Sequence, residues 1–168
     1  MTTHTYDFDG ISRSFNVYVP SSYKSNAEAL PMVFFLHGLG GSMNNFSGLT
    51  YKAEAEKYIM VIPQGLVDQR TGSTSWHSGA GVFGSYSNST IDDVGFINSM
   101  IDSISSWHTV DQDRIYSIGF SMGGYMTNRL GCELGDRIAA IASVAGTIGN
   151  EIVNNCNPEN IIPSLHIH

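Results

Sequence analysis

Apolar and polar positions along the chain follow two alternating patterns. Several short runs are almost wholly apolar and end at glycine or proline, which is typical of strands buried on both faces of a sheet. One segment near the N-terminus instead alternates apolar and polar residues, as a half-buried strand does. The resulting candidate strands are 13–20, 31–38, 58–65, 114–120, 138–146 and 163–168.

Between these runs, apolar residues recur at spacings of three and four, which indicates amphipathic helices. Helices are expected over 50–57, 92–107 and 121–132. Thr90 and Asp93 have the spacing of a capping box at the start of the second helix. Strands that alternate with helices predict βαβ units, so we expect one α/β domain over residues 1–168 with a mainly parallel sheet.

Residues 64–91 interrupt this rhythm with turn-forming residues almost throughout. A loop that long in a compact domain is usually functional or disordered. Trp76 and His77 lie in its middle, and either could contribute to a substrate pocket. Alternatively, Trp76 is a packing anchor beneath a surface loop.

Composition excludes some functions. The 168 residues contain 8 basic and 15 acidic side chains, a net charge of −7 that is poorly suited to nucleic acid or to anionic membranes. No stretch reaches the roughly 20 apolar residues of a membrane span, and the first ten residues do not resemble a signal peptide. The scarcity of charge favours a secreted or periplasmic protein whose leader has been removed, with the cytoplasm as the alternative.

The strongest chemical signal is Gly119-Phe120-Ser121-Met122-Gly123. In a nucleophile elbow a serine occupies a strained turn between a strand and a helix, and flanking glycines allow close packing of the turn. Here a strand pattern precedes the motif and a helix pattern follows it. We therefore predict that Ser121 is a catalytic nucleophile.

A second signal, His37-Gly38-Leu39-Gly40-Gly41-Ser42, follows the strand at 31–38. Acyl transfer requires N–H donors directed at the developing oxyanion. In this type of fold, one donor belongs to the residue after the nucleophile, here Met122, and the other to a Gly-rich loop after an earlier strand. We expect the second donor to be Leu39, with Gly40 as the alternative. A phosphate-binding loop would require a following lysine, which this segment lacks.

Six segments together resemble the polyhydroxybutyrate depolymerase and feruloyl esterase family of α/β-hydrolases: PMVFFLHGLGGS, VIPQG, DDVGFI, DQDRIYSIGFSMGGYMTNRL, IAAIASVAGT and PSLHIH. The resemblance spans about residues 10–168. It implies a three-layer fold and a carboxylic-ester hydrolase without metal or cofactor, acting on a small or polymeric ester. Ser121 would be the nucleophile, with the Leu39 and Met122 amides as the oxyanion hole.

In that family the segment resembling PSLHIH is followed by the triad acid and later by the triad histidine, so both are expected beyond residue 168. The fold would then lack its C-terminal strands and helices here. Glu133 and Asp136 are expected to be solvated near a helix end, and Glu151 and Glu159 to lie in a polar loop. His166 and His168 are expected to be structural residues of a buried strand. His37 is expected to pack beneath the Gly-rich loop. A serine peptidase, or an inactive domain that serves as a binding module, are the alternatives to an esterase.

Two further expectations concern assembly. Cys132 ends the helix after the elbow and Cys156 lies in the loop before the last strand, so the two are expected to form a disulfide. In the chain-entropy model its loop of about 24 residues would contribute ~3 kcal/mol. The strand at 163–168 would be a sheet edge, through which the chain could form homo-oligomers. His4 is expected to be disordered.

Overall fold

The computed structural model describes residues 1–24, 28–81 and 91–168. Its strands are β1 (Thr2–Phe8), β2 (Ile11–Tyr18), β3 (Leu30–Leu36), β4 (Ile59–Pro63), β5 (Leu66–Asp68), β6 (Ser73–Ser75), β7 (Val110–Phe120), β8 (Ala140–Val144) and β9 (Ser164–Ile167). Its helices are α1 (Thr50–Glu56), α2 (Asp93–Trp107), α3 (Met122–Glu133) and α4 (Asn150–Val153), with a 3₁₀ turn η1 (Ser47–Leu49).

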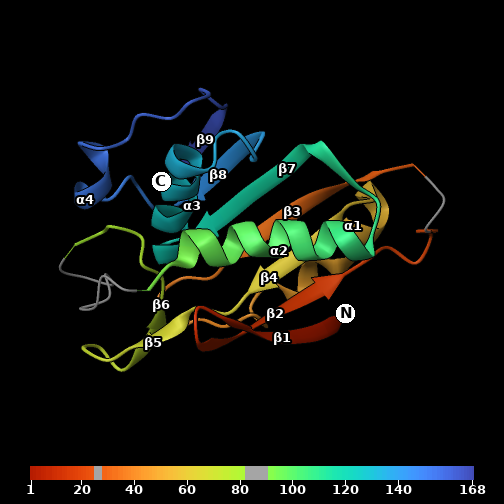
Figure 1. The fold of residues 1–168 in the computed structure, drawn as a ribbon, viewed down its shortest axis with the longest axis horizontal. Coiled ribbons are helices and arrows are strands. Elements are labelled where there is room, and N and C mark those ends of the chain that lie inside the picture. The colour runs from red at the N-terminus through yellow and green to blue at the C-terminus, as the bar shows by residue number, and fades with distance from the viewer. Residues whose placement is uncertain (25–27, 82–90) are drawn as a thin grey trace.

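Seven strands form one sheet in the order β1-β2-β4-β3-β7-β8-β9 (Figure 1). The pairs β1–β2 and β2–β4 are antiparallel, and the remaining pairs are parallel. The prediction of a mainly parallel sheet is therefore confirmed, and each of the six predicted strands overlaps one that forms.

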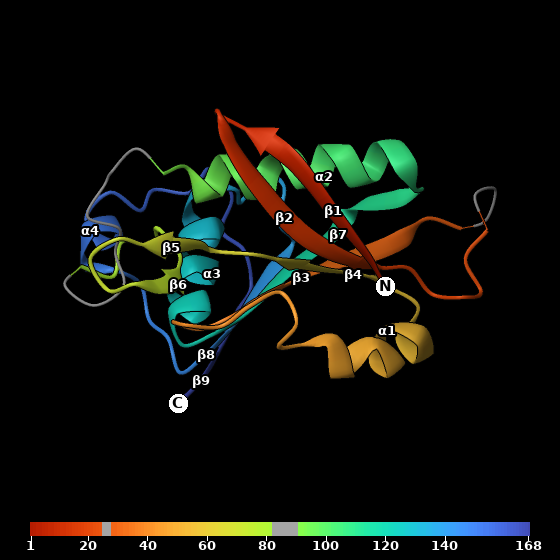
Figure 2. The same ribbon diagram turned by 90° about the horizontal axis from the view of Figure 1, so that it is seen from below.

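Helices cover both faces of this sheet. Figure 2 shows α1 on one side and α2 on the other. Apolar side chains of α2 and α3 share the larger core with the sheet, around Phe34, Ile97 and Met126. On the opposite face, Ala53 of α1 packs in a smaller cluster with Phe35. The expected three layers of an α/β-hydrolase are present.

The N-terminal strand was missed by the prediction, and the expectation that His4 is disordered is wrong. His4 lies in β1, and its ring stacks on those of Phe15 and Trp107. Asp9 and Gly10 join β1 to β2 with φ of 52° and 74°. A two-residue Asp-Gly connection with both φ positive is the preferred turn of a tight hairpin, so the sequence did contain a signal for β1.

The segment 64–91 is not one continuous loop. Its first half forms the antiparallel hairpin β5–β6, whose three-residue strands are too short to produce a periodic pattern. Residues 82–90 lie outside the described part of the chain, and so does Thr90 of the expected capping box. The cap of α2 is instead Asp92, whose side chain accepts a hydrogen bond from the N–H of Gly95.

At the far edge of the sheet, β9 pairs only with β8 in the described structure. All four of its residues are exposed, so the expectation of a buried strand is wrong. Leu165 and Ile167 are about half exposed because no element of the described chain covers them. The edge position is as expected, whereas association through it stays a prediction.

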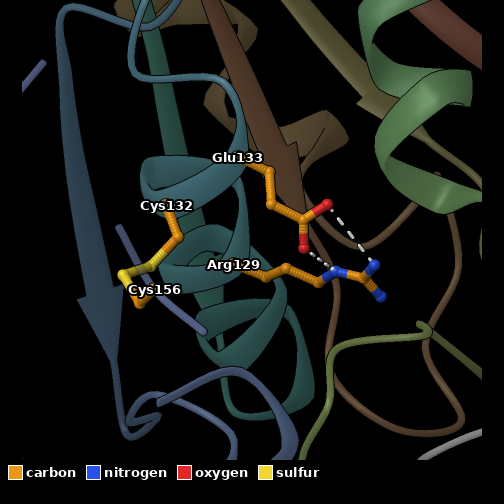
Figure 3. The surroundings of a disulfide bond; sticks show 4 residues. All are labelled: Arg129, Cys132, Glu133 and Cys156. Carbon is orange, nitrogen blue, oxygen red and sulfur yellow. Dashed lines mark hydrogen bonds and ion pairs between the residues drawn. A yellow bond between two sulfur atoms is a disulfide. The ribbon is translucent and has the colours of Figure 1, made fainter. Parts of the chain in front are cut away.

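A disulfide joins Cys132 of α3 to Cys156, with the two Cα atoms 5.3 Å apart (Figure 3). One turn before Cys132, Arg129 forms an ion pair with Glu133 of the same helix. The bond therefore connects the helix that follows Ser121 to the irregular segment between α4 and β9.

Candidate active site at the ends of β3 and β7

Ser121 is the single residue between the end of β7 and the start of α3. Its φ of 52° and ψ of −117° are unusual for a residue with a side chain, and such a backbone persists only when its surroundings hold it. Here the Ser121 N–H donates to the Val144 carbonyl of β8, and its own carbonyl accepts from the N–H groups of Gly124 and Tyr125.

The flanking glycines are required by close contacts between backbone segments. A Cβ on Gly119 would overlap the carbonyl of Gly123, and one on Gly123 would overlap the carbonyl of Leu36. A Cβ on Gly124 would lie only 3.1 Å from Gly146 Cα. The turn thus has the strand, strained serine, helix and tight packing of a nucleophile elbow.

The Gly-rich loop lies beside this turn because β3 and β7 are parallel neighbours. Leu36, the last residue of β3, pairs with Gly119, so the two chain segments leave the sheet together. A Cβ on Gly38 would lie 3.3 Å from Ser121 Cβ, which places the loop backbone in contact with the serine.

The backbone N–H groups of Leu39 and Met122, on the two segments next to Ser121, have no hydrogen-bond acceptor within residues 1–24, 28–81 and 91–168. The first precedes Gly40 in the loop, and the second begins α3. The N–H of Gly40 instead donates to the Thr74 carbonyl at 2.8 Å. Gly40, the alternative donor suggested by the sequence, is therefore already engaged.

His37 is buried beneath the loop, as expected. Its Nε2 accepts from the Gly65 N–H at 3.0 Å, so Nδ1 carries the proton and donates to the Gly38 carbonyl at 2.8 Å. Burial lowers the pKa of His37 below its ordinary value, partly offset by the Gly38 hydrogen bond and by the charge of Asp93. With both ring nitrogens engaged, His37 is a structural residue rather than a base.

Trp76 is a packing anchor and not the wall of a pocket. Its side chain is fully buried, its Nε1–H donates to the His37 carbonyl at 2.8 Å, and its ring lies against that of His37. The next residue, His77, is also held in place. Its N–H donates to Asp93 at 2.7 Å, and its ring Nδ1 lies 2.7 Å from the Ile91 carbonyl. Trp76 thus fits the packing anchor that was the alternative prediction from the sequence, whereas a substrate contact of His77 stays a prediction.

A cavity of about 300 Å³ opens beside the loop and the elbow. Apolar side chains dominate its wall, and two of them, Leu39 and Phe120, are about half exposed. Its lining residues are His37, Gly38, Leu39, Gly41, Asn45, Phe46 and Phe120.

The described residues bring no acid–base pair to Ser121. Its hydroxyl forms no hydrogen bond with any of them, whether histidine or carboxylate. His166 lies on exposed β9 and His168 directly follows that strand, with the two ring centroids 6.5 Å apart, and Glu133 pairs with Arg129. Within the same residues, no group of three histidine, cysteine or acidic side chains could hold a metal ion.

The family model for phospholipases and carboxylesterases matches residues 20–168 of this chain. The chain belongs to the phospholipase/carboxylesterase family of α/β-hydrolases. Feruloyl esterase B of Piromyces equi is 47% identical over 77 residues, which are 45% of this chain and 14% of that protein. Feruloyl esterase D of Neurospora crassa is 26% identical over 158 residues, covering 86% of this chain and 49% of that protein.

Among solved structures, a thermostable esterase superimposes with a TM-score of 0.70 at 19% identity, covering 90% of this carboxylesterase-family chain and 42% of the other. This likeness supports the fold. The chain spans about half, or less, of the length of these relatives. The resemblance to feruloyl esterases is confirmed, whereas the polyhydroxybutyrate depolymerase part of it stays a prediction.

Sequence reasoning missed the residues that support the loop. Gln64, Thr74 and Asp93 all take part in its hydrogen-bond network directly or through His77. Only Asp93 carried a signal, because an acidic residue within a helical apolar stripe is unusual unless it is paired. Within the described residues, no helix is long and apolar enough to cross a membrane.

Proposed function

We propose that the protein hydrolyses carboxylic esters through an acyl-enzyme on Ser121. The observation that carries this proposal is the pair of unpaired N–H groups, of Leu39 and Met122, on the two segments that flank the strained serine. Preorganised donors at this place would stabilise the negative charge on the carbonyl oxygen without reorganisation during the reaction.

The reaction follows from this geometry in two steps. Ser121 Oγ forms a bond to the ester carbonyl carbon while a general base takes the hydroxyl proton. The resulting oxyanion accepts hydrogen bonds from the N–H groups of Leu39 and Met122. The intermediate expels the alcohol, which receives that proton, and leaves an acyl-serine. Water then attacks the acyl carbon, its proton passes to the base, and the acid is released as the serine hydroxyl re-forms.

The base and its acid partner are proposed to lie outside residues 1–168. None of the described histidines forms a hydrogen bond with Ser121, and the rings of His37 and His77 bond backbone carbonyls instead. The relatives are about twice as long as this chain or longer, so they contain residues that this chain does not cover. The same segment would add the strands that cover β9.

For the substrate we propose an ester with an aromatic acyl group. The cavity beside Ser121 is lined in part by Phe46 and Phe120. Their rings can pack against a flat aromatic acyl group better than against a polar acyl group. The two relatives compared above are named feruloyl esterases, in agreement with this choice. A short-chain ester and a polyester such as polyhydroxybutyrate are the competing substrates, and a peptide is the least suited because its amine leaving group is harder to expel.

A fluorophosphonate probe on the full-length protein tests the nucleophile. Wild type is expected to incorporate one label at Ser121, and Ser121→Ala none. Ser106→Ala, an exposed serine at the far end of α2, is the matched control and is expected to label as wild type does. Hydrolysis of methyl ferulate, p-nitrophenyl butyrate and polyhydroxybutyrate then ranks the substrates. Turnover that persists in Ser121→Ala would exclude this mechanism.

We further propose that the protein works outside the cytoplasm. The Cys132–Cys156 disulfide supports this proposal, because such bonds persist mainly in oxidising compartments. Fractionation of the producing cells, with detection of the protein in the medium or periplasm, tests it. Recovery with the cytosolic markers alone would contradict it.

A further inference from the structure

The β5–β6 hairpin contacts the Gly-rich loop through its second strand. Thr74 forms two hydrogen bonds with it: its carbonyl accepts from the Gly40 N–H at 2.8 Å, and its Oγ1–H donates to the Gly41 carbonyl. Two residues on, Trp76 Nε1–H donates to the His37 carbonyl at 2.8 Å. The hairpin, together with Trp76 directly after it, therefore holds the loop on both sides of Leu39.

The pattern of these bonds leaves the Leu39 N–H without an acceptor among the described residues. His37, Gly40 and Gly41 each contribute a backbone group to the hairpin, and the Gly38 carbonyl is taken by His37 Nδ1 and by the Gly41 N–H at 3.0 Å. Leu39 lies in the centre of this arrangement with its N–H unpaired. The residues on either side of Leu39 are thus held by the hairpin and by Trp76, while the Leu39 N–H stays free of any acceptor in the described chain.

The hairpin end is in turn fixed to elements far away in the sequence. The His77 N–H donates to Asp93, whose other oxygen pairs with buried Arg13 at 2.6 Å. The His77 carbonyl accepts from Arg129 of α3. These bonds connect the residue after Trp76 to β2, to α2 and to the helix that follows Ser121. Such a cross-braced segment can hold a loop with little freedom.

We propose that the β5–β6 hairpin sets the position of the Leu39 N–H in the transition state, with Thr74 and Trp76 as positioning residues. The proposal rests on the proposed ester hydrolysis at Ser121. Neither side chain contacts the substrate: Trp76 is fully buried, and neither residue lines the cavity beside Ser121. They act through the loop.

A residue that positions an oxyanion donor affects the transition state more than the bound substrate. A ground-state carbonyl carries little negative charge, so a displaced donor weakens substrate binding only slightly. Loss of a whole donor costs about 10²–10³ in kcat, and a displacement of about 1 Å can cost about 10². Variants of the hairpin are therefore expected to lower kcat while leaving KM nearly unchanged.

Steady-state kinetics of the full-length protein with p-nitrophenyl acetate test this. Thr74→Val keeps the side-chain shape and the backbone carbonyl but removes the Oγ1–H donor, and we expect kcat to fall about tenfold. Trp76→Phe removes the Nε1–H donor to the His37 carbonyl, and we expect kcat to fall by about tenfold to a hundredfold. In both, KM stays within about twofold, and the inhibition constant of a trifluoromethyl ketone, whose hemiketal oxyanion occupies the hole, rises by the factor lost in kcat/KM.

Each variant has a matched control. Thr71→Val removes a hydroxyl from the turn of the same hairpin, where it bonds Asp68 rather than the loop. Trp107→Phe alters a tryptophan at the end of α2 that stacks on Phe15. Both are expected to retain kcat within about twofold. Equal losses of kcat in the controls, or a rise in KM at unchanged kcat in Thr74→Val and Trp76→Phe, would overturn the proposal.

Amide hydrogen exchange in residues 36–42 separates this proposal from the proposed function. Thr74→Val and Trp76→Phe are expected to speed exchange there, while the two controls do not. If the wild-type protein hydrolyses no ester, the proposed function fails. Amide hydrogen exchange in residues 36–42 then still tests whether the hairpin holds the loop. Faster exchange with full retention of kcat would refute a positioning role, as would unchanged exchange in both variants.

Discussion

The two chain segments that meet at Ser121 are held in place by different means. The elbow, residues 119–124, is fixed by backbone packing: glycines approach the Leu36 carbonyl and each other too closely for any side chain. The Gly-rich loop, residues 37–41, is fixed by hydrogen bonds with Gln64, Thr74 and Trp76. The elbow packs directly on the backbone of the neighbouring chain segments, whereas the loop depends on a hairpin some thirty residues away.

The difference has an energetic consequence. A glycine contact fails abruptly, because an added methyl must displace backbone on both sides. A hydrogen-bond scaffold loses one member at a time, and each buried partner left unpaired costs on the order of 1–3 kcal/mol. We therefore expect the loop to tolerate graded changes that the elbow does not, except at the buried ion pair that anchors its support.

That ion pair is where the largest effect is expected. Asp93→Ala would leave the Arg13 guanidinium buried without its carboxylate and release the His77 N–H. Breaking a buried pair from one side typically costs about 3–5 kcal/mol. Asp102→Ala on the same helix is the matched control, because Asp102 is 67% exposed in its pair with Arg137 and such pairs contribute about 0–1 kcal/mol. Urea unfolding midpoints compare the two, and equal losses would contradict the assigned role.

The elbow is tested by Gly123→Ala. The added methyl would overlap the Leu36 carbonyl, so we expect the free energy of unfolding to fall by about 3 kcal/mol or more. Gly48→Ala is the control, since a Cβ there would meet no atom within 4 Å. Thermal unfolding of both variants measures the contrast. A Gly123→Ala protein as stable as wild type would show that backbone packing does not hold the elbow.

This contrast also explains what could be predicted from the sequence. The elbow is encoded within five residues, so Gly119, Ser121 and Gly123 could be identified directly. The strands β3 and β7 could be predicted for a similar reason, because burial on both faces makes them continuously apolar. The support of the loop could not, because Thr74 lies on a three-residue strand without a period, Trp76 directly follows that strand, and the partners of both side chains are backbone carbonyls.

The disulfide lies behind the elbow and should affect stability without affecting the turn itself. Replacing Cys132 and Cys156 by serine removes a cross-link over 24 residues, and we expect a loss of about 3 kcal/mol in the free energy of unfolding. Because the glycines hold Ser121 independently, probe labelling at Ser121 should stay within about twofold of wild type. Thiol titration of the unreduced, denatured wild type should find no free cysteine, and two free thiols would refute the pairing.

The smallest expected effect is a dependence of stability on pH, which distinguishes the Gly-rich loop from the elbow. Of the two segments, only the loop contains a buried titratable side chain, that of His37. Burial lowers the pKa of His37 from 6.5, so the folded chain binds its proton less tightly than the unfolded chain. The stabilisation contributed by neutral His37 is therefore complete above about pH 6.5 and is lost as the pH falls from there through the folded-state pKa. One proton gives a slope of at most about 1.4 kcal/mol per pH unit in this window.

His37→Gln should flatten that slope, because glutamine can still accept from the Gly65 N–H but binds no proton. Its absolute stability will differ as well, so the informative quantity is the change of unfolding free energy with pH, from urea titrations at intervals below pH 7. His166→Gln, at an exposed position on β9, is the matched control. The glycine-packed elbow contributes no titrating group to this slope. If the change of unfolding free energy with pH is the same in His37→Gln as in wild type, protonation of His37 is not its cause, and other groups in the molecule account for it.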